Sequence, residues 1–258
     1  MLPSPVRNVD LLVKYEGVKA FIRRELKGSG AKGLVLGLSG GLDSSMALKA
    51  CVDSVGKDSV LGLLLPEAGL TPAADQDDAV ALASRLGVAT EKMDISPMVE
   101  AFSGFLPGDR LARGNLKARV RMSLLYYLAN LQSRLVVGTG DRSEILLGYF
   151  TKWGDGGVDL LPLAGLYKTE LRVLGRYLGL PPSITEKVSS PRLWEGQTAE
   201  GELGIPYELA DRILVLLTQE GLSPVAAKAR LSAGHEVDLV VAKMATSKHK
   251  REMPHICP

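Results

Sequence analysis

The apolar positions of the chain fall into two kinds of segment, short continuous runs and longer stretches with helical spacing. Short apolar runs are typical of strands buried on both faces of a parallel sheet. Apolar positions that recur every three or four residues are typical of amphipathic helices. We therefore expect strands at residues 33–38, 60–65, 89–95 and 134–138. Helices are expected from about Ser44 onward after the first strand and at 9–27, 72–86, 97–105, 115–132, 168–178, 206–217, 224–231 and 236–245.

This order of elements predicts an α/β fold. Strands that alternate with helices through short connections are typical of a doubly wound, three-layer α/β/α sandwich with a mainly parallel sheet, whose ligands bind at the carboxyl ends of the strands. No linker, repeat or low-complexity tract interrupts the 258 residues, so we expect one domain over 1–258. Residues 151–160 form a glycine-rich loop, and the long polar segment 187–203 is expected to be a mobile lid.

The turn after the first strand, residues 37–45, carries the first sign of chemistry. Its adjacent glycines, Gly40 and Gly41, allow backbone conformations that other residues rarely adopt. Successive N–H groups can then surround an anion at the positive end of the following helix, for which Ser44 and Ser45 are the expected N-caps. The turn therefore predicts a phosphate-binding loop, the alternative being a strand-to-helix turn that binds nothing.

A carboxylate follows the glycines where a Walker A loop would have its lysine. Asp43 next to bound phosphates requires a cation between them, and Mg²⁺ is the usual one. A second polar loop, 139–144, follows the fourth strand and is expected to supply another ligand group. Residues 28–33 match G-x-G-x-x-G but precede a strand, so they do not form a dinucleotide-binding turn.

Composition excludes several classes of protein. A net charge of +2 and 5% aromatic residues argue against a nucleic-acid partner. Two separated cysteines, Cys51 and Cys257, fit a reducing compartment rather than a disulfide framework. No apolar run approaches the roughly 20 residues of a membrane span, and the N-terminus has no long apolar stretch of the secretory kind. We expect a cytoplasmic protein without a membrane partner.

The motifs together resemble a known family. Ser-Gly-Gly-Leu-Asp-Ser at 39–44 resembles the PP-loop of the ATP pyrophosphatases, which split ATP between its α- and β-phosphates. Within that superfamily, seven blocks in order resemble the NAD synthetases, and the resemblance covers about residues 10–255. The blocks are residues 39–45, 113–122, 138–144, 150–159, 167–171, 193–202 and 249–251.

The resemblance implies a ligase that amidates deamido-NAD (nicotinate adenine dinucleotide) to NAD with ATP and ammonia, the last step of NAD biosynthesis. A carboxylate is a poor electrophile, so ATP first adenylates it and releases pyrophosphate. Ammonia then attacks the mixed anhydride, and AMP leaves. Glutamine would require a second active site, for which neither cysteine has a neighbouring acid and base, although a separate amidase subunit could supply ammonia.

The resemblance also implies residue roles. Asp43 and Glu144 are expected to share Mg²⁺, Lys168 to neutralise phosphates, and Asp159 is a candidate for the base that deprotonates ammonium. The expected ATP-binding residues are Gly37, Leu38, Ser39, Gly40, Gly41, Leu42, Asp43, Ser44, Thr139, Lys168 and Ser190. The expected deamido-NAD-binding residues are Arg119, Lys152, Asp159, His249 and Lys250.

Each role has a plainer alternative. Glu144 can be a first-turn helix acid, Arg119 part of a solvated helix face, and the tail at 248–251 a frayed terminus. The family resemblance further implies a homodimer, with helix 115–132 as the candidate interface; the alternatives are core burial or a mixed role. Other PP-loop enzymes, such as GMP synthetase or tRNA-modifying enzymes, and a nucleotide-binding regulatory protein are the rival functions.

Overall fold

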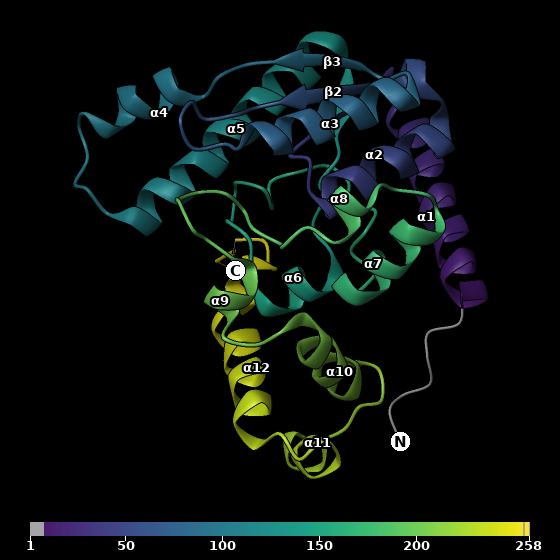
Figure 1. Cartoon of the computed structure of the whole chain (residues 1–258), viewed down its shortest axis with the longest axis vertical. Helices are drawn as coiled ribbons and strands as arrows, with labels where there is room; N and C mark the ends of the chain where they lie inside the picture. The colour runs from purple at the N-terminus through teal and green to yellow at the C-terminus, as the bar shows by residue number, and fades with distance from the viewer. Residues whose placement is uncertain (1–7, 255, 258) are drawn as a thin grey trace.

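Four parallel strands form the centre of the computed structural model, which describes residues 8–254, 256 and 257. The sheet order is β3–β2–β1–β4 (Figure 1). The strands are β1 (Gly33–Gly37), β2 (Val60–Leu64), β3 (Ala89–Lys92) and β4 (Arg134–Val136). All four expected strands are present, but β3 ends early because Asp94 accepts hydrogen bonds from the amide and hydroxyl of Ser96 and turns the chain into a helix.

Helices cover both faces of the sheet, which confirms the three-layer α/β/α fold (Figure 1). Because side chains alternate along a strand, Leu34 and Leu36 pack on one face and Val35 on the other. The first face is covered by α1 (Asn8–Ser29), α2 (Leu42–Val55), α3 (Ala73–Leu86) and α7 (Lys168–Tyr177). The second face is covered by α4 (Ser96–Ser103) and α5 (Arg110–Gln132).

The C-terminal third of the chain adds a helical layer with its own core (Figure 1). Its centre is formed by fully buried apolar side chains such as Tyr207, Ile213 and Val237. The elements of this layer are α6 (Arg142–Leu147), α9 (Ala199–Leu203), α10 (Tyr207–Thr218), α11 (Pro224–Leu231), α12 (Gly234–Thr246) and the short 3₁₀ helix η2 (Lys248–Lys250). The short helix α8 (Pro182–Thr185) packs instead in the main core with α2 and α7, and the 3₁₀ helix η1 (Lys57–Ser59) precedes β2. Within the described residues, no helix is long and apolar enough to cross a bilayer.

The sheet order creates a topological switch point between β1 and β4. The chain leaves β1 through α2 on one face and reaches β4 from α5 on the other. Connections that diverge to opposite faces leave a crevice at the carboxyl ends of the two strands, and this is where ligands bind in such folds. The glycine turn after β1 and the polar loop after β4 both lie at this crevice.

Several helix starts differ from the expected ones, and two of these differences concern the capping residue. The helix after β1 begins at Leu42 with Gly41 as its N-cap, so the expected N-cap roles of Ser44 and Ser45 are wrong. Helix α5 begins at Arg110 rather than 115, because the Asp109 carboxylate accepts a hydrogen bond from the Ala112 amide at 2.6 Å and caps it. The sequence contains this N-cap signal at Asp109, but Gly114 in the second turn weakens the helical pattern that follows it.

The two cysteines are expected to differ sharply in reactivity. Cys51 in α2 is fully buried, and burial raises the pKa of its thiol to about 12, whereas Cys257 is exposed. At pH 8 only about one Cys51 thiol in 10⁴ is ionised, and the thiolate is the reactive form. We expect DTNB to titrate one thiol in the folded protein, none in a Cys257→Ser variant and two in wild-type protein in denaturant. Rapid reaction of two thiols in the folded protein would contradict this burial.

Candidate active site

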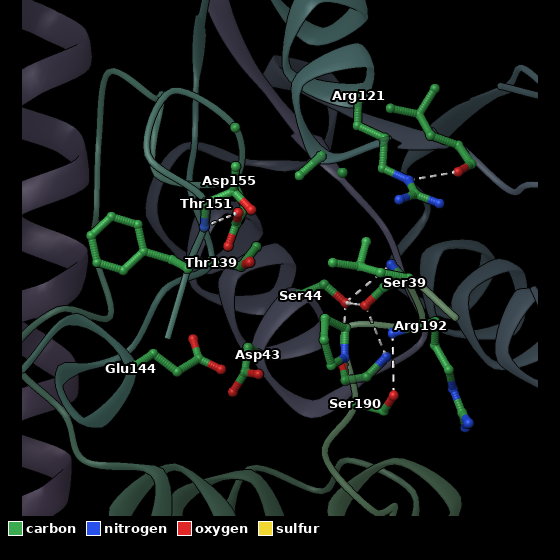
Figure 2. A pocket seen from close by; sticks show the side chains of 18 of the residues that line it. Ser39, Asp43, Ser44, Arg121, Thr139, Glu144, Thr151, Asp155, Ser190 and Arg192 are labelled. Carbon is green, nitrogen blue, oxygen red and sulfur yellow. Dashed lines mark hydrogen bonds between the residues drawn. The ribbon is translucent and has the colours of Figure 1, made fainter. Parts of the chain in front are cut away.

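A cavity of about 390 Å³ lies at the switch point (Figure 2). Its walls come from the glycine turn after β1, from α5, from the segment 148–158 and from the segment 187–194. These segments are distant in sequence, and the sheet topology brings them to one edge. Of the expected ATP-binding residues, those that line the cavity are Gly37, Leu38, Ser39, Gly41, Leu42, Asp43, Ser44, Thr139 and Ser190.

The glycine turn has a shape that its neighbours fix. Gly40 has a φ of +72°, and a Cβ atom there would lie 1.9 Å from the carbonyl oxygen of Asp75, so only glycine fits. The Ser39 and Ser44 hydroxyls lie 3.0 Å apart, and the Gly41 amide donates to the Ser39 hydroxyl at 3.2 Å. These bonds give the turn a defined form at the start of α2. Gly40 faces Asp75 rather than the cavity.

A buried lysine joins three carboxylates beside this turn. The Lys168 Nζ, which is fully buried, lies 2.7 Å from Asp43 Oδ2, 2.9 Å from Asp141 Oδ2 and 2.9 Å from Glu144 Oε1. Asp43 and Glu144 line the cavity, whereas Lys168 lies behind them. Lys168 does not line the cavity, and its expected role toward the phosphates stays a prediction. Its ammonium holds the two cavity-lining carboxylates in place.

A helix start brings Asp141 and Glu144 together. The Asp141 carboxylate accepts from the Glu144 amide at 2.8 Å, and Glu144 Oε2 accepts from the Asp141 amide at 3.4 Å, which is a capping box. The expected loop 139–144 thus becomes α6 from Arg142 onward. Glu144 does act as a first-turn acid, but its Oε1 atom still reaches Lys168. Asp141 was missed as a site residue, although Asp-x-x-Glu is a capping signal.

The charges of this cluster do not balance. When all four groups are ionised, three carboxylates against one ammonium leave a formal charge of −2. Burial raises the pKa of Asp141 to about 6 and raises the pKa of Glu144 well above its usual value. Burial alone would lower the pKa of Lys168, but the charges of Asp141, Asp43 and Glu144 outweigh it and raise that pKa. The lysine stays protonated, and the site favours a further cation.

The cavity side of this cluster fits Mg²⁺. Asp43 Oδ1 is buried and accepts no hydrogen bond from any described residue. Figure 2 shows the Asp43 and Glu144 side chains converging on the same space. In the described part of the chain, no group of three or more Asp, Glu, His or Cys side chains could hold a metal by itself. Mg²⁺ commonly takes one or two carboxylates and completes its shell with substrate phosphates and water, which matches this pair.

Most of the expected deamido-NAD residues lie outside the cavity. Lys250 lines it, and its Nζ donates to the carbonyls of Gly148 and Phe150 at 2.8 Å. Arg119 donates to the Lys152 carbonyl, and Lys152 donates to the His249 carbonyl, so these three residues meet near the tail. The tail is therefore tied to the rest of the protein rather than frayed at these residues.

Asp159 also lies outside the cavity. Its exposed carboxylate accepts hydrogen bonds from the Tyr126 hydroxyl at 2.9 Å and from the Val136 amide at 2.8 Å. Another acid of the same glycine-rich loop, Asp155, lines the cavity instead (Figure 2). Asp155 accepts from the Thr151 amide at 2.8 Å. Its side chain is also accessible to solvent, but the protein atoms around the cavity desolvate it and raise its pKa. The family resemblance pointed to Asp159, and spacing alone does not tell which acid of the loop faces the cavity.

Arg121 is a second cavity residue that received no role from the sequence. Its Nε donates to the Leu65 carbonyl at 3.0 Å, which places the guanidinium in the wall opposite the glycine turn (Figure 2). Burial lowers its pKa, although arginine remains charged at any ordinary pH. The helical period could have indicated this residue, because Arg119 and Arg121 lie two positions apart on one helix and therefore point to different sides.

The segment 187–198 forms one wall of the cavity. Lys187 Nζ donates to the Gly40 carbonyl at 2.8 Å and to the carboxylates of Asp75 and Asp78 at 2.8 and 2.7 Å. Farther along, the Leu193 carbonyl accepts from Lys117 at 2.8 Å. The expected lid 187–203 is thus bonded to the rest of the protein at Lys187 and at Leu193, and its last residues form α9. Its mobility stays a prediction.

The chain is similar to known proteins over most of its length. The sequence matches the NAD synthase family profile over residues 14–254. It is 50% identical to the NH₃-dependent NAD⁺ synthetase of Hyperthermus butylicus, over 93% of this chain and 90% of that one. It is 47% identical to the enzyme of the same name from Methanosarcina mazei, over 92% of this chain and 94% of that one.

Two solved structures of synthetases have a similar fold over almost the whole chain. An NMN synthetase from Francisella tularensis superposes with a TM-score of 0.84 at 32% identity, over 96% of this chain and 98% of that one. An NH₃-dependent NAD synthetase from Campylobacter jejuni superposes with a TM-score of 0.83 at 30% identity, over 96% of this chain and all of that one. The sequence match and these structures lead to one conclusion: the chain belongs to the NAD synthase family.

Proposed function

We propose that this chain is an ammonia-dependent NAD synthetase that converts deamido-NAD, ATP and ammonia into NAD, AMP and pyrophosphate through an adenylated intermediate. The observation that carries the proposal is the meeting of the glycine turn with the Asp43–Glu144 pair in one cavity. The relatives named NH₃-dependent NAD⁺ synthetase at 47–50% identity support the same reaction. We further propose that the whole chain works as one catalytic domain in the cytoplasm.

The residues of the cavity suit the first half-reaction. Backbone N–H groups of the glycine turn and the Ser39 and Ser44 hydroxyls bind the ATP phosphates at the start of α2. Asp43 and Glu144 would hold Mg²⁺, which would neutralise charge on the phosphates when bound. The substrate carboxylate attacks the α-phosphorus, the bond to the bridging oxygen breaks, and pyrophosphate leaves. Lys168 supports this step by fixing both carboxylates.

The second half-reaction needs ammonia as a free base. Ammonia attacks the activated carbonyl, and AMP leaves with the electron pair of the broken bond. A carboxylate that faces the cavity can take a proton from ammonium, and Asp155 is better placed for this role than the candidate Asp159. The geometry therefore moves the proposed base to the other acid of the glycine-rich loop.

A homodimer would explain the site residues that lie outside the cavity. Helix α5 buries Val120 and Leu128 in the core but exposes 67% of Tyr127 and 68% of Leu131. Asp159 bonds to Tyr126 of the same helix. We propose that a second copy packs on this face of α5 and that deamido-NAD extends from the cavity toward the boundary. The mixed role considered for this helix is the one proposed here.

Product analysis tests the proposed function and its nitrogen source. We expect the purified chain with ATP, Mg²⁺ and deamido-NAD to form NAD with ammonium, and to form little with glutamine in ammonia-free buffer. Formation should rise with pH as free ammonia increases.

Parallel reactions with nicotinate mononucleotide address the alternative raised by the NMN synthetase neighbour. Faster turnover of the mononucleotide would change the proposed substrate, and deamido-NAD-independent ATP–pyrophosphate exchange would favour a different PP-loop enzyme.

Loss of either cavity carboxylate should abolish adenylation. We expect Asp43→Asn and Glu144→Gln each to lower deamido-NAD-dependent ATP–pyrophosphate exchange by at least about 10²-fold, because each removes a charged Mg²⁺ ligand that the other cannot replace. Asp238→Asn is the control, since it removes the charge of an exposed acid paired with Lys228. Circular dichroism should show all three variants folded. Near-normal exchange by either cavity variant would rule out the shared metal.

The dimer is tested by charging the exposed face of α5. We expect Leu131→Glu to raise the dimer dissociation constant at least about tenfold in sedimentation velocity, since a charge would be buried against the second copy. Val13→Glu, at an equally exposed position of α1, should leave the dimer intact. A wild-type chain that is monomeric and fully active at micromolar concentration would remove the proposal.

A further inference from the structure

Asp211 is a buried acid that the proposed chemistry does not use. It lies on α10 and is 4% exposed. Its Oδ1 accepts from the Ser143 hydroxyl at 2.5 Å, and its Oδ2 accepts from the Thr169 amide at 2.9 Å and the Thr169 hydroxyl at 2.8 Å. All three of these donors are neutral groups. A buried carboxylate with donors of this kind requires an explanation.

The three donors belong to the first turns of two helices. Ser143 lies in the first turn of α6, and Thr169 lies in the first turn of α7. The positive ends of both helices favour a negative charge at Asp211. Burial raises the pKa of Asp211, whereas the bonds from Ser143 and Thr169 lower it. A single carboxylate from the C-terminal helical layer therefore joins the starts of α6 and α7.

The residues next to these donors form the charged cluster. Ser143 precedes Glu144, and Thr169 follows Lys168. The Lys168 amide also donates to the Ser143 hydroxyl at 3.0 Å, and that hydroxyl donates its own proton to Asp211. The bonds thus run in one direction, from the Lys168 amide through Ser143 to the carboxylate. Asp211 therefore holds the residue before Glu144 and the residue after Lys168 with one carboxylate.

We propose that Asp211 is a positioning residue that fixes Glu144 relative to Lys168 and thereby shapes the Mg²⁺ site. This inference rests on the proposed function for the identity of that site. Asp211 can hold a precise position because its neighbours on α10, Ala210 and Ile213, are fully buried in the C-terminal core. The carboxylate provides acceptors on both oxygens. An amide would turn an N–H donor toward one side and break the directed bonds.

The test compares two substitutions on the same helix. Asp211→Asn removes one acceptor and one charge. Glu208→Gln is the matched control, because Glu208 also reaches α7, through Arg172 at 2.6 Å, but its side chain is 64% exposed and does not contact the cluster. Both variants lose one negative charge between α10 and α7. Only the first should disturb the metal site.

Three measurements separate positioning from general stability. Amide hydrogen exchange at Glu144, Lys168 and Thr169 should become at least tenfold faster in Asp211→Asn. Mn²⁺ binding with α,β-methylene-ATP, followed by electron paramagnetic resonance, should weaken at least fivefold. ATP–pyrophosphate exchange should need correspondingly more Mg²⁺ for half-maximal rate. Glu208→Gln should stay within twofold of wild type in each.

A second variant guards against unfolding of the first. Ser143→Ala cuts the bond path and leaves Asp211 its two bonds to Thr169, so we expect the same changes at smaller size. The double variant Asp211→Asn/Ser143→Ala should show changes in amide exchange and Mn²⁺ binding no larger than those of the more affected single variant, because both substitutions act through one path. Folded variants with unchanged amide exchange and Mn²⁺ binding, or equal effects of Asp211→Asn and Glu208→Gln, would overturn the proposal. Failure of the proposed function would appear separately, as absence of NAD formation by wild-type protein, and the amide exchange would still decide the role of Asp211.

Discussion

The ion cluster around Lys168 is the interaction on which the site depends. An ammonium with no solvent exposure must keep its carboxylate partners, because removal of one member of a buried ion pair costs about 3–5 kcal/mol. Asp43 comes from α2, Glu144 from α6, Asp141 from the N-cap of α6, and Lys168 from α7. The lysine therefore holds three helix starts at one point. The glycine turn, the metal-binding pair and the helical C-terminal layer are all positioned relative to it.

The sheet topology explains why this cluster lies where a nucleotide can reach it. The order β3–β2–β1–β4 places the ends of β1 and β4 side by side while their connections leave on opposite faces. The helix after β1 brings Asp43, and the helix after β4 brings Glu144. Neither helix alone makes a metal site. The switch point of the sheet makes the pair, and α7 supplies the cation that holds it.

Much of this arrangement could be predicted from the sequence because it depends on local patterns. Buried strands show as apolar runs, and the glycine turn with Asp43 follows directly from them. Asp141 was missed because its role depends on a lysine that lies 27 residues later in the chain. Asp159 and Asp155 could not be told apart, since the direction of a loop side chain depends on packing against distant helices. The contacts of Lys187 could not be predicted either, because its partner Gly40 is distant in the sequence.

The close contact between Gly40 and the Asp75 carbonyl has a consequence for how related chains are judged. The glycine is required by its protein neighbour, so it would persist in a descendant that had lost catalysis and kept only the fold. Asp43 has no such structural tie on its Oδ1 atom, which accepts no bond from the described residues. Its Oδ2 atom is paired with the buried Lys168, so an inactive descendant would lose the acid and the lysine together and keep the glycine. The glycine signature marks the architecture, and the acids with their lysine mark a working enzyme.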